Sequence, residues 1–264
     1  MAKRYVRVRA DQRQIYYGFL QANRSVSVLD APPWLGGQPT DIELAVDTYQ
    51  FLAPCAPSKI IAVGRNYLKH AQEMKTALPQ EPLLFSKPPT AVIATRQPIL
   101  YPQQSQQVDY EGELAIVIGK KSFNLSQKEA ASSIWGYTIA NDVTARDLQK
   151  KDSQWTRAKG FDTFCPLGPW IVRELAADAV IQTFINDEET PRQSSPVFEM
   201  AFPPEMLVSY LSQIMTLLPG DVILCGTPAG VGAIVPGDVV TIKIEGIGEI
   251  SNPVLSGQRI VGYS

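Results

Sequence analysis

The amino-acid sequence predicts a β-rich α+β protein with a rolled or barrel-like core. Many short apolar runs end at turns that contain Gly or Pro, and few stretches have the period of a helix. Residues 114–118 are one of the strands that this pattern predicts. The clearest helix spans residues 203–211, and we expect Leu207, Tyr210 and Leu211 on its core face.

The composition is that of an ordinary globular protein. The chain has 264 residues, of which 45% are hydrophobic and 19% charged, and its formal net charge is −2. Because no basic block extends beyond Lys150 and Lys151, we expect neither nucleic acid nor a membrane as a partner. No apolar run approaches the roughly 18 residues of a membrane-spanning helix. Cys55, Cys165 and Cys225 form no C-x-x-C motif, which predicts free thiols in a reducing cytoplasm.

Residues 1–57 are expected to form a small N-terminal β domain, and residues 58–264 a second, larger domain. Alternating runs at residues 5–9, 15–20 and 25–29 predict a three-stranded meander, and a Pro-bearing linker follows. Because the N-terminal part carries no motif with a chemical function, we expect it to serve in packing, for example at a subunit interface.

Three carboxylates are the most informative feature of the sequence. The period of two on a strand places Glu111 and Glu113 on one face, opposite the core-facing apolar residues. A second strand ends at Asp142, where its carboxylate can turn toward the other two. Each pair of carboxylates at ~4 Å would repel by roughly 4 kcal/mol at an effective dielectric of about 20, so a buried cluster needs a cation.

The identity of this cation follows by elimination. One His and three scattered Cys make a zinc site improbable, whereas an all-oxygen donor set favours Mg²⁺, then Mn²⁺, ahead of Ca²⁺. In the alternative interpretation, Glu111 and Glu113 are exposed at a sheet edge and Asp142 is a turn residue.

His70 is the only histidine of the chain and a candidate general base. A short helix after the turn at residues 64–66 places His70 and Glu73 on one face, so that Glu73 can orient the ring. Arg65, in the turn itself, is a candidate substrate-binding residue. The polar segment 75–82 suits a lid that closes over a substrate. The alternative is a surface His beside a surface Glu.

Further polar residues follow the proposed metal ligands. Arg146 and Gln149 lie three residues apart in a short helix, and Arg can hold a carboxylate through two parallel hydrogen bonds. Lys159 can stabilise a developing oxyanion, and the Gly-rich loop around Thr227 can present N–H groups and a hydroxyl to a carboxylate. Lys87 either faces the same pocket or is a solvated charge at a strand end. Each of these residues has an alternative interpretation as an exposed charge or a simple turn.

Five motifs occur in a fixed order, and together they resemble the fumarylacetoacetate hydrolase family over about residues 58–255. The motifs are G-R-N-Y-x-x-H-x-x-E-M from residue 64, D-Y-E-G-E-L from residue 109, N-D-V-T-A-R-D from residue 141, A-K-G-F-D-T from residue 158 and L-x-P-G-D-V-I-x-x-G-T-P-x-G-V-G from residue 217. Any one of them alone would be unspecific.

The resemblance implies a mixed β-sandwich roll, a homodimer, and a cytoplasmic enzyme that acts on small 2-oxo or 2,4-dioxo acids. It also implies a role for each matching residue. These are Mg²⁺ or Mn²⁺ ligation by Glu111, Glu113 and Asp142, water activation by His70 and Glu73, and substrate binding by Arg146, Gln149, Lys159 and Thr227.

We therefore expect a Mg²⁺-dependent hydrolase or lyase that breaks C–C bonds, as an acylpyruvase or an oxaloacetate decarboxylase does. His70 favours cleavage, whereas an N-terminal unit like residues 1–57 is more usual in family members that are isomerases or hydratases. A 2-hydroxy-diene-dioate isomerase or an oxaloacetate tautomerase is therefore the alternative within the family. Outside it, a metal-dependent nuclease would need a basic surface, and a non-catalytic scaffold would need none of the polar cluster.

Overall fold

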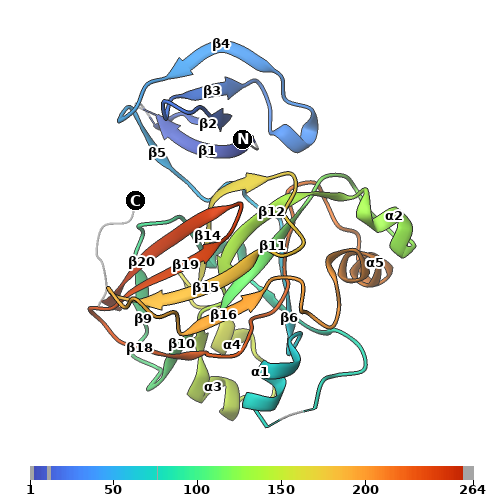
Figure 1. The fold of residues 1–264 in the computed structure, drawn as a ribbon, viewed down its shortest axis with the longest axis vertical. Coiled ribbons are helices and arrows are strands. Elements are labelled where there is room, and N and C mark those ends of the chain that lie inside the picture. Colours follow the sequence, from blue (N-terminus) through green and yellow to red (C-terminus); the bar gives the residue numbers. More distant parts are fainter. Residues whose placement is uncertain (1–2, 11–12, 76, 258–264) are drawn as a thin grey trace.

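The computed structural model describes residues 3–10, 13–75 and 77–257 of the chain. In Figure 1 the N-terminal strands form a small layer at one end of a larger body. Strands far outnumber helices among the described residues, and they form both antiparallel and parallel pairs. The predicted β-rich α+β class is confirmed.

The largest sheet runs through both parts of the chain. Its strands are β1 Arg4–Ala10, β2 Ile15–Leu20, β3 Val26–Leu29, β4 Pro39–Leu44, β5 Tyr49–Phe51, β6 Ile60–Gly64, β7 Leu83–Lys87, β8 Val92–Ile93, β11 Gly112–Ile118, β12 Ile134–Asn141, β14 Cys165–Val172 and β17 Val222–Leu224. They follow the spatial order β4-β3-β2-β1-β14-β12-β11-β17-β6-β7, with β5 beside β1 and β8 beside β14.

Two further sheets complete the roll. One contains β9 Ile99–Tyr101, β15 Val180–Ile185, β16 Gln193–Pro196, β19 Val239–Ile244 and β20 Gly248–Ser256, in the order β16-β15-β19-β20-β9. The other contains β10 Val108–Tyr110, β13 Thr144–Ala145 and β18 Gly232–Ile234, in the order β13-β10-β18. Strands β15, β19 and β20 pack against β11, β12 and β14, so the main hydrophobic core lies between two facing sheets.

Strand β11 lies at the centre of the fold and is covered on both faces. Leu114, Ile116 and Ile118 enter the main core between the sheets, as predicted. Ala115 and Val117, on the other face, belong to a second hydrophobic cluster. Any polar side chain at the start of this strand is therefore enclosed by protein.

Gly112, the first residue of β11, faces side chains of β15, β16 and β19 at close range. A Cβ atom at this position would lie 2.5 Å from Oγ1 of Thr183 on β15, a distance that real contacts do not show. A larger residue would push the sheets apart. The glycine between the two predicted metal ligands is therefore required by the packing.

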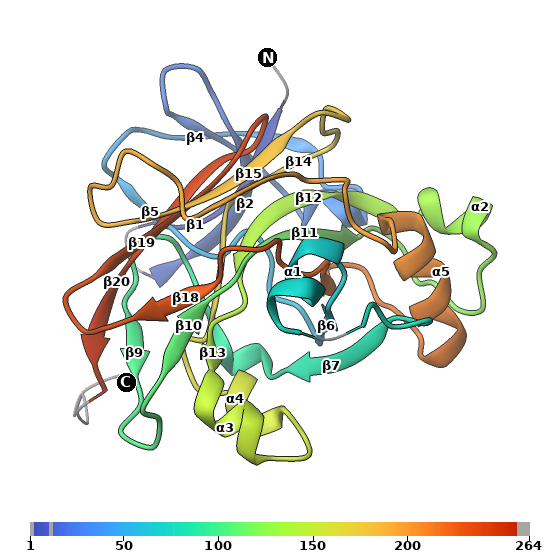
Figure 2. The same ribbon diagram turned by 60° about the horizontal axis from the view of Figure 1, so that its bottom comes forward.

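The helices are short and lie on the outside of the sheets (Figures 1 and 2). They are α1 Leu68–Glu73, α2 Gln127–Ala131, α3 Arg146–Lys151, α4 Thr156–Lys159 and α5 Pro204–Ile214. Leu207 and Leu211 of α5 are buried as predicted, but Tyr210 lies at the rim and Val208 takes its place in the core. None of the helices in the described ranges is long and apolar enough to cross a membrane.

The N-terminal strands do not stop at the predicted three-stranded meander. Strands β4 and β5 join the same sheet, and β1 pairs with β14 through Tyr5 and Ile171. The strand β4 escaped prediction because it begins with Pro39 and its side chains are largely exposed, as is typical of an edge strand. The expected boundary at residue 57 lies between β5 and β6.

Candidate active site

The three predicted carboxylates meet where two neighbouring strands end. Glu113 lies on β11, Glu111 directly precedes that strand, and Asp142 directly follows β12. The antiparallel register pairs Gly112 with Asn141, so the Asp142 N–H donates to the Glu111 carbonyl oxygen at 2.8 Å. One carboxylate oxygen from each acidic residue lies within 4.8 Å of the other two, and all three residues are buried. The alternative of exposed acids at a sheet edge is therefore wrong.

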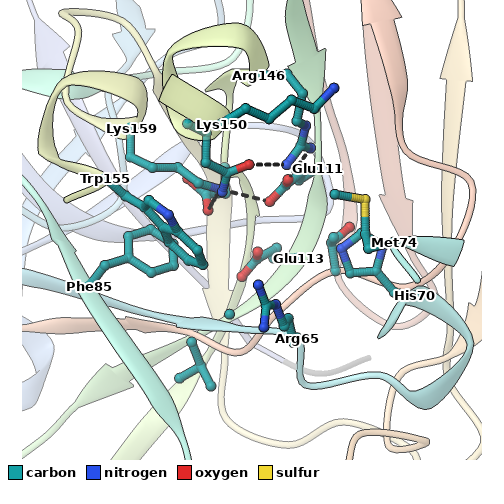
Figure 3. Close-up of a pocket in the computed structure, with 15 residues that line it drawn as sticks. Arg65, His70, Met74, Phe85, Glu111, Glu113, Arg146, Lys150, Trp155 and Lys159 are labelled. Atoms are coloured by element: carbon teal, nitrogen blue, oxygen red, sulfur yellow. Dashed lines mark hydrogen bonds and ion pairs between the residues drawn. The ribbon is translucent and has the colours of Figure 1, made fainter. Parts of the chain in front are cut away.

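Two buried lysines neutralise part of this charge. Lys159 Nζ donates to Glu111 Oε2 at 2.9 Å and to Asp142 Oδ2 at 2.5 Å, and Figure 3 shows it reaching the acids from α4. Lys87 Nζ, at the end of β7, donates to Asp142 Oδ1 at 2.6 Å. Lys87 is therefore not a solvated charge at a strand end; it contacts the acidic cluster, although it is not among the residues that line the pocket.

The acids differ in their protonation behaviour. Burial would raise the pKa of Glu111, but the positive charges of Lys159 and Arg146 outweigh it and lower this pKa. Burial raises the pKa of Glu113 well above its ordinary value, and the charges of Asp142 and Glu111 raise it further. Glu113 therefore keeps its proton to a higher pH than an ordinary glutamate, unless a cation replaces that proton.

Arg146, the first residue of α3, supports this cluster from the side. Its Nε donates to Asp109 Oδ2 at 2.8 Å, one terminal nitrogen donates to Glu111, and the other donates to Gln149 Oε1 at 2.6 Å. Arg146 and Gln149 both line the pocket that the acids face. Much of the guanidinium is thus engaged by protein side chains, and its predicted role in substrate binding stays a prediction.

His70 and Glu73 form the predicted pair on α1. His70 is buried, and its Nδ1 lies 3.2 Å from Glu73 Oε2. The N–H of Gly230 in turn donates to the Glu73 carboxylate at 3.1 and 3.2 Å, which fixes the orientation of this side chain. Of the predicted lid segment 75–82, residue 76 lies outside the described residues, and the lid stays a prediction.

Arg65 occupies a strained turn at the end of β6. Its φ of 57° lies in the left-handed region, which is unfavourable for a residue with a side chain. The neighbouring Asn66 holds the turn, since its Nδ2 donates to the carbonyl oxygens of Cys225 at 2.7 Å and Phe202 at 3.0 Å. Asn66 was not predicted as a site residue, although it belongs to the same motif.

The loop after β17 contacts the acids through its backbone. The N–H of Gly226 donates to Glu113 Oε2 at 2.7 Å, as expected for an N–H-presenting loop. The hydroxyl of Thr227 donates to the carbonyl oxygen of Gly112 at 2.8 Å. The loop thus binds the strand that carries the acids, and substrate binding by Thr227 stays a prediction.

These side chains surround one pocket with a volume of about 200 Å³, shown in Figure 3. Every predicted site residue except Glu73 lines it, and Glu73 contacts His70. The lining residues are Val63, Gly64, Arg65, His70, Met74, Phe85, Glu111, Glu113, Asp142, Arg146, Gln149, Lys150, Trp155, Lys159 and Thr227.

Sequence reasoning missed the apolar wall of the pocket. Phe85 and Trp155 pack edge to face with their ring centroids 5.2 Å apart, and Met74 lines the opposite side near the histidine. The sequence spacing could have indicated two of these residues, Phe85 and Trp155. Phe85 precedes Lys87 by two residues on a strand, and Trp155 precedes Lys159 by about one helical turn.

The fold and this polar pocket are those of an enzyme. The family model described as fumarylacetoacetate (FAA) hydrolase C-terminal matches residues 59–255, and a second, described as Rv2993c-like, N-terminal, matches residues 3–54. The chain therefore belongs to the fumarylacetoacetate hydrolase family.

Similar proteins carry several activities. The mitochondrial oxaloacetate tautomerase fahd2 of Xenopus laevis is 42% identical, over 80% of this chain and 70% of its own length. The 5-carboxymethyl-2-hydroxymuconate delta-isomerase structure from Mycobacterium smegmatis has a TM-score of 0.89 at 42% identity, covering 96% of this chain and 99% of that one. The fumarylpyruvate hydrolase of Pseudomonas aeruginosa, solved with Mn²⁺ and pyruvate, has a TM-score of 0.72 at 33% identity, covering 78% and 92%.

Proposed function

We propose that this chain is a divalent-metal-dependent enzyme that transfers a proton at the carbon beside the oxo group of small 2-oxo acids, as a tautomerase or isomerase does. The observation that carries the proposal is the position of His70, which is buried, contacts Glu73 and lines the same pocket as three clustered carboxylates, so that it can move a proton there. The sequence alone favoured C–C cleavage by this histidine, and the similar proteins shift our preference to proton transfer. The tautomerase and isomerase relatives, both 42% identical, support this reaction type.

The residues present fit a Mg²⁺ or Mn²⁺ ion. Three carboxylates are a hard, all-oxygen donor set, which these ions prefer. When all four buried acids are ionised, they face three buried cationic groups, which leaves one net negative charge in this cluster. A divalent ion that replaces the proton of Glu113 would bring the cluster to one net positive charge. The groups are Asp109, Glu111, Glu113 and Asp142 against Lys87, Arg146 and Lys159.

A positive pocket suits an anionic substrate. The bound ion would supply Lewis-acid polarisation of the oxo group and a ligand position for the substrate carboxylate. The ammonium group of Lys159 would stabilise the negative charge that develops on the oxo oxygen when the neighbouring carbon loses its proton. Arg65 and Gln149, which also line the pocket, would bind a second polar end of the substrate.

His70 would carry the proton. Because Nδ1 contacts Glu73, the exchange with the substrate would occur at Nε2, which takes a proton from C3 and returns it to C3 or to the oxo oxygen. Glu73, held by Gly230, fixes the ring orientation. The aromatic rings of Phe85 and Trp155, which line the pocket, would limit the access of water, so that the proton would return to the substrate.

C–C cleavage is the second candidate. The same His70–Glu73 pair can hold and deprotonate a water molecule, whose attack on the 4-oxo carbon of an acylpyruvate breaks the C3–C4 bond and releases pyruvate and a carboxylic acid. The similarity to fumarylpyruvate hydrolase supports this candidate. Oxaloacetate decarboxylation would break the corresponding bond and release CO₂.

One experiment separates these reactions. The purified protein is given oxaloacetate and acetylpyruvate, with EDTA or with added Mg²⁺, while enol absorbance and pyruvate release are recorded in parallel. We expect Mg²⁺-dependent enol–keto exchange of oxaloacetate without matching pyruvate release. Pyruvate formed as fast as enol is lost would favour cleavage, and equal rates with and without EDTA would contradict metal dependence.

We also propose a cytoplasmic homodimer. The three cysteines are free and buried, which suits a reducing compartment. The side chains of Phe123 and Ile214 are 65% and 54% exposed. Their segments lie side by side, because the Asn124 N–H donates to the Ser212 carbonyl oxygen. We propose that these two side chains form an apolar patch that contacts a second copy of the chain. Sedimentation equilibrium should give twice the mass of the 29.0 kDa chain. A monomer at micromolar concentration would contradict the proposal.

A further inference from the structure

Gln193, the first residue of β16, is fully buried behind the acidic cluster and uses every hydrogen-bonding position of its amide. Its Oε1 accepts from the N–H of Gly112 at 3.0 Å and from the Thr183 hydroxyl at 2.7 Å. Its Nε2 donates to Thr227 Oγ1 at 2.8 Å and to the carbonyl oxygen of Pro228 at 2.9 Å. A buried amide with two donors and two acceptor positions all engaged is held in one orientation.

The partners themselves fix which end of the amide points where. The Gly112 N–H is only a donor, so it must face Oε1 of Gln193. The carbonyl oxygen of Pro228 is only an acceptor, so it must face Nε2. A flipped amide would lose both bonds.

Thr227 closes a ring of hydrogen bonds around Gly112. Its hydroxyl donates to the Gly112 carbonyl oxygen at 2.8 Å while it accepts from Gln193. The N–H of Gly112 is thus bound by Gln193 and its carbonyl oxygen by Thr227. These side chains make the hydrogen bonds that the backbone of a neighbouring strand would otherwise make. Because Gly112 lies between Glu111 and Glu113, the ring holds the backbone that carries two of the three acids.

The single hydrogen of the Thr227 hydroxyl is used in this ring. The hydroxyl therefore retains only an acceptor position, which cannot donate to a carboxylate substrate. On the adjacent residue, the Gly226 N–H donates to Glu113 Oε2 at 2.7 Å. The loop thus holds Glu113 at its carboxylate and, through the ring, at its backbone.

We propose that Gln193 and Thr227 are positioning residues that set the affinity of the acidic cluster for its divalent ion. This inference rests on the metal dependence proposed above. Ligand carboxylates bind an ion tightly only when their own supports hold them in place, and loss of such supports commonly weakens metal binding by about 10–100-fold. Neither residue needs to touch the ion for this effect.

The test measures the Kd for Mn²⁺ by isothermal titration calorimetry and does not depend on enzymatic activity. Gln193→Met keeps the length of the side chain but has neither the amide donors nor the oxygen acceptor, and Thr227→Val removes the hydroxyl without changing its volume. We expect each to raise the Kd for Mn²⁺ by about 10–100-fold. Thr227→Ser keeps the hydroxyl and should bind Mn²⁺ as the wild type does. Because the ring acts as a unit, the double variant should be little weaker than either single one.

Matched controls separate positioning from a general loss of stability. Asn252 is a buried amide that donates to the carbonyl oxygens of Ala94 and Gln97, and Thr138 is a buried hydroxyl bound to the carbonyl oxygens of Gly168 and Trp170. We expect Asn252→Leu and Thr138→Val to lower the melting temperature without changing the Kd for Mn²⁺.

Two results would overturn the inference. Ring variants that melt earlier but bind Mn²⁺ as tightly as the wild type would show a role in folding alone. A wild-type chain that binds no Mn²⁺ would overturn the proposed function together with this inference, so the two failures are distinguishable.

Discussion

Lys87 Nζ lies 2.6 Å from Asp142 Oδ1, and both side chains are completely shielded from solvent. The lysine comes from the end of β7 and the aspartate from the end of β12, so the contact joins segments 55 residues apart. An ion pair without water depends on both partners, because either charge left alone in the interior is strongly unfavourable. The contact therefore couples the stability of the fold to the geometry of the candidate metal site.

Lys87→Met should lower the free energy of unfolding by about 1–3 kcal/mol, since Asp142 Oδ1 loses its buried partner while Lys159 still pairs with Oδ2. Urea denaturation of the wild type and the variant in EDTA measures the difference. The control is Lys69→Met, whose exposed ammonium lies 3.8 Å from Glu199 and should contribute almost nothing. Equal stability of all three proteins would show that the buried pair is not important for folding.

His70→Ala should lower kcat/KM for the 2-oxo acid by roughly 10²–10⁴, because the proton-transfer group is lost. The Kd for Mn²⁺ should stay within a few-fold of wild type, since the histidine is not one of the three clustered carboxylates. Glu73→Gln should have a smaller effect, because Gly230 can still hold the side chain in place. Unchanged turnover in His70→Ala would refute the catalytic role.

Mg²⁺ binding should release protons and strengthen as the pH rises. The pKa of Glu113 is raised by burial and by its acidic neighbours, so the metal-free carboxyl stays protonated at pH values where an ordinary glutamate is ionised. A divalent ion binds the ionised carboxylate, so its affinity should increase with pH until the pH exceeds the raised pKa of Glu113. Calorimetry in two buffers with different ionisation enthalpies counts the protons. A Kd that is the same at every pH would contradict the assignment of Glu113 as a ligand.

The thiols should be inert in the folded protein. Burial raises the pKa of Cys55 and of Cys165 to about 12, and it raises that of Cys225 as well. At pH ~8, a thiol with such a pKa is ionised in about one molecule in 10⁴, and the thiolate is the reactive form. A colorimetric thiol assay should therefore detect all three cysteines only after unfolding in guanidinium. A thiol that reacts in the native state would show that one of these sites opens.

Local sequence patterns predicted those parts of the site that depend on one element. The two-residue period put Glu111 and Glu113 on the same side, and the spacing on a helix joined His70 to Glu73. The family motifs brought Arg65, Arg146, Gln149, Lys159 and Thr227 to the same pocket, although the roles of these residues stay to be tested.

Other features depend on contacts between distant segments, and no local pattern contains them. Asp142 meets Glu111 because of the register between β11 and β12, which a single sequence does not specify. The ring that includes Gln193 forms only when β16 packs against the loop after β17. Tyr210 was wrongly placed in the core because Leu207, Val208 and Leu211 already form the buried stripe of α5.

The pairing of Tyr5 with Ile171 makes the start of the chain a shield for β14. Without the N-terminal strands, the backbone of β14 at Ile171 would lack its pairing partner and could pair with a strand of another molecule. The ring of Trp170, which now packs against Phe51, would be exposed beside it. A variant that begins at residue 58 would therefore aggregate more readily, although it would keep every residue of the candidate active site. The first strands thus cover an edge of β14 that would otherwise be open to pairing with another chain, which gives them a structural role without any chemistry of their own.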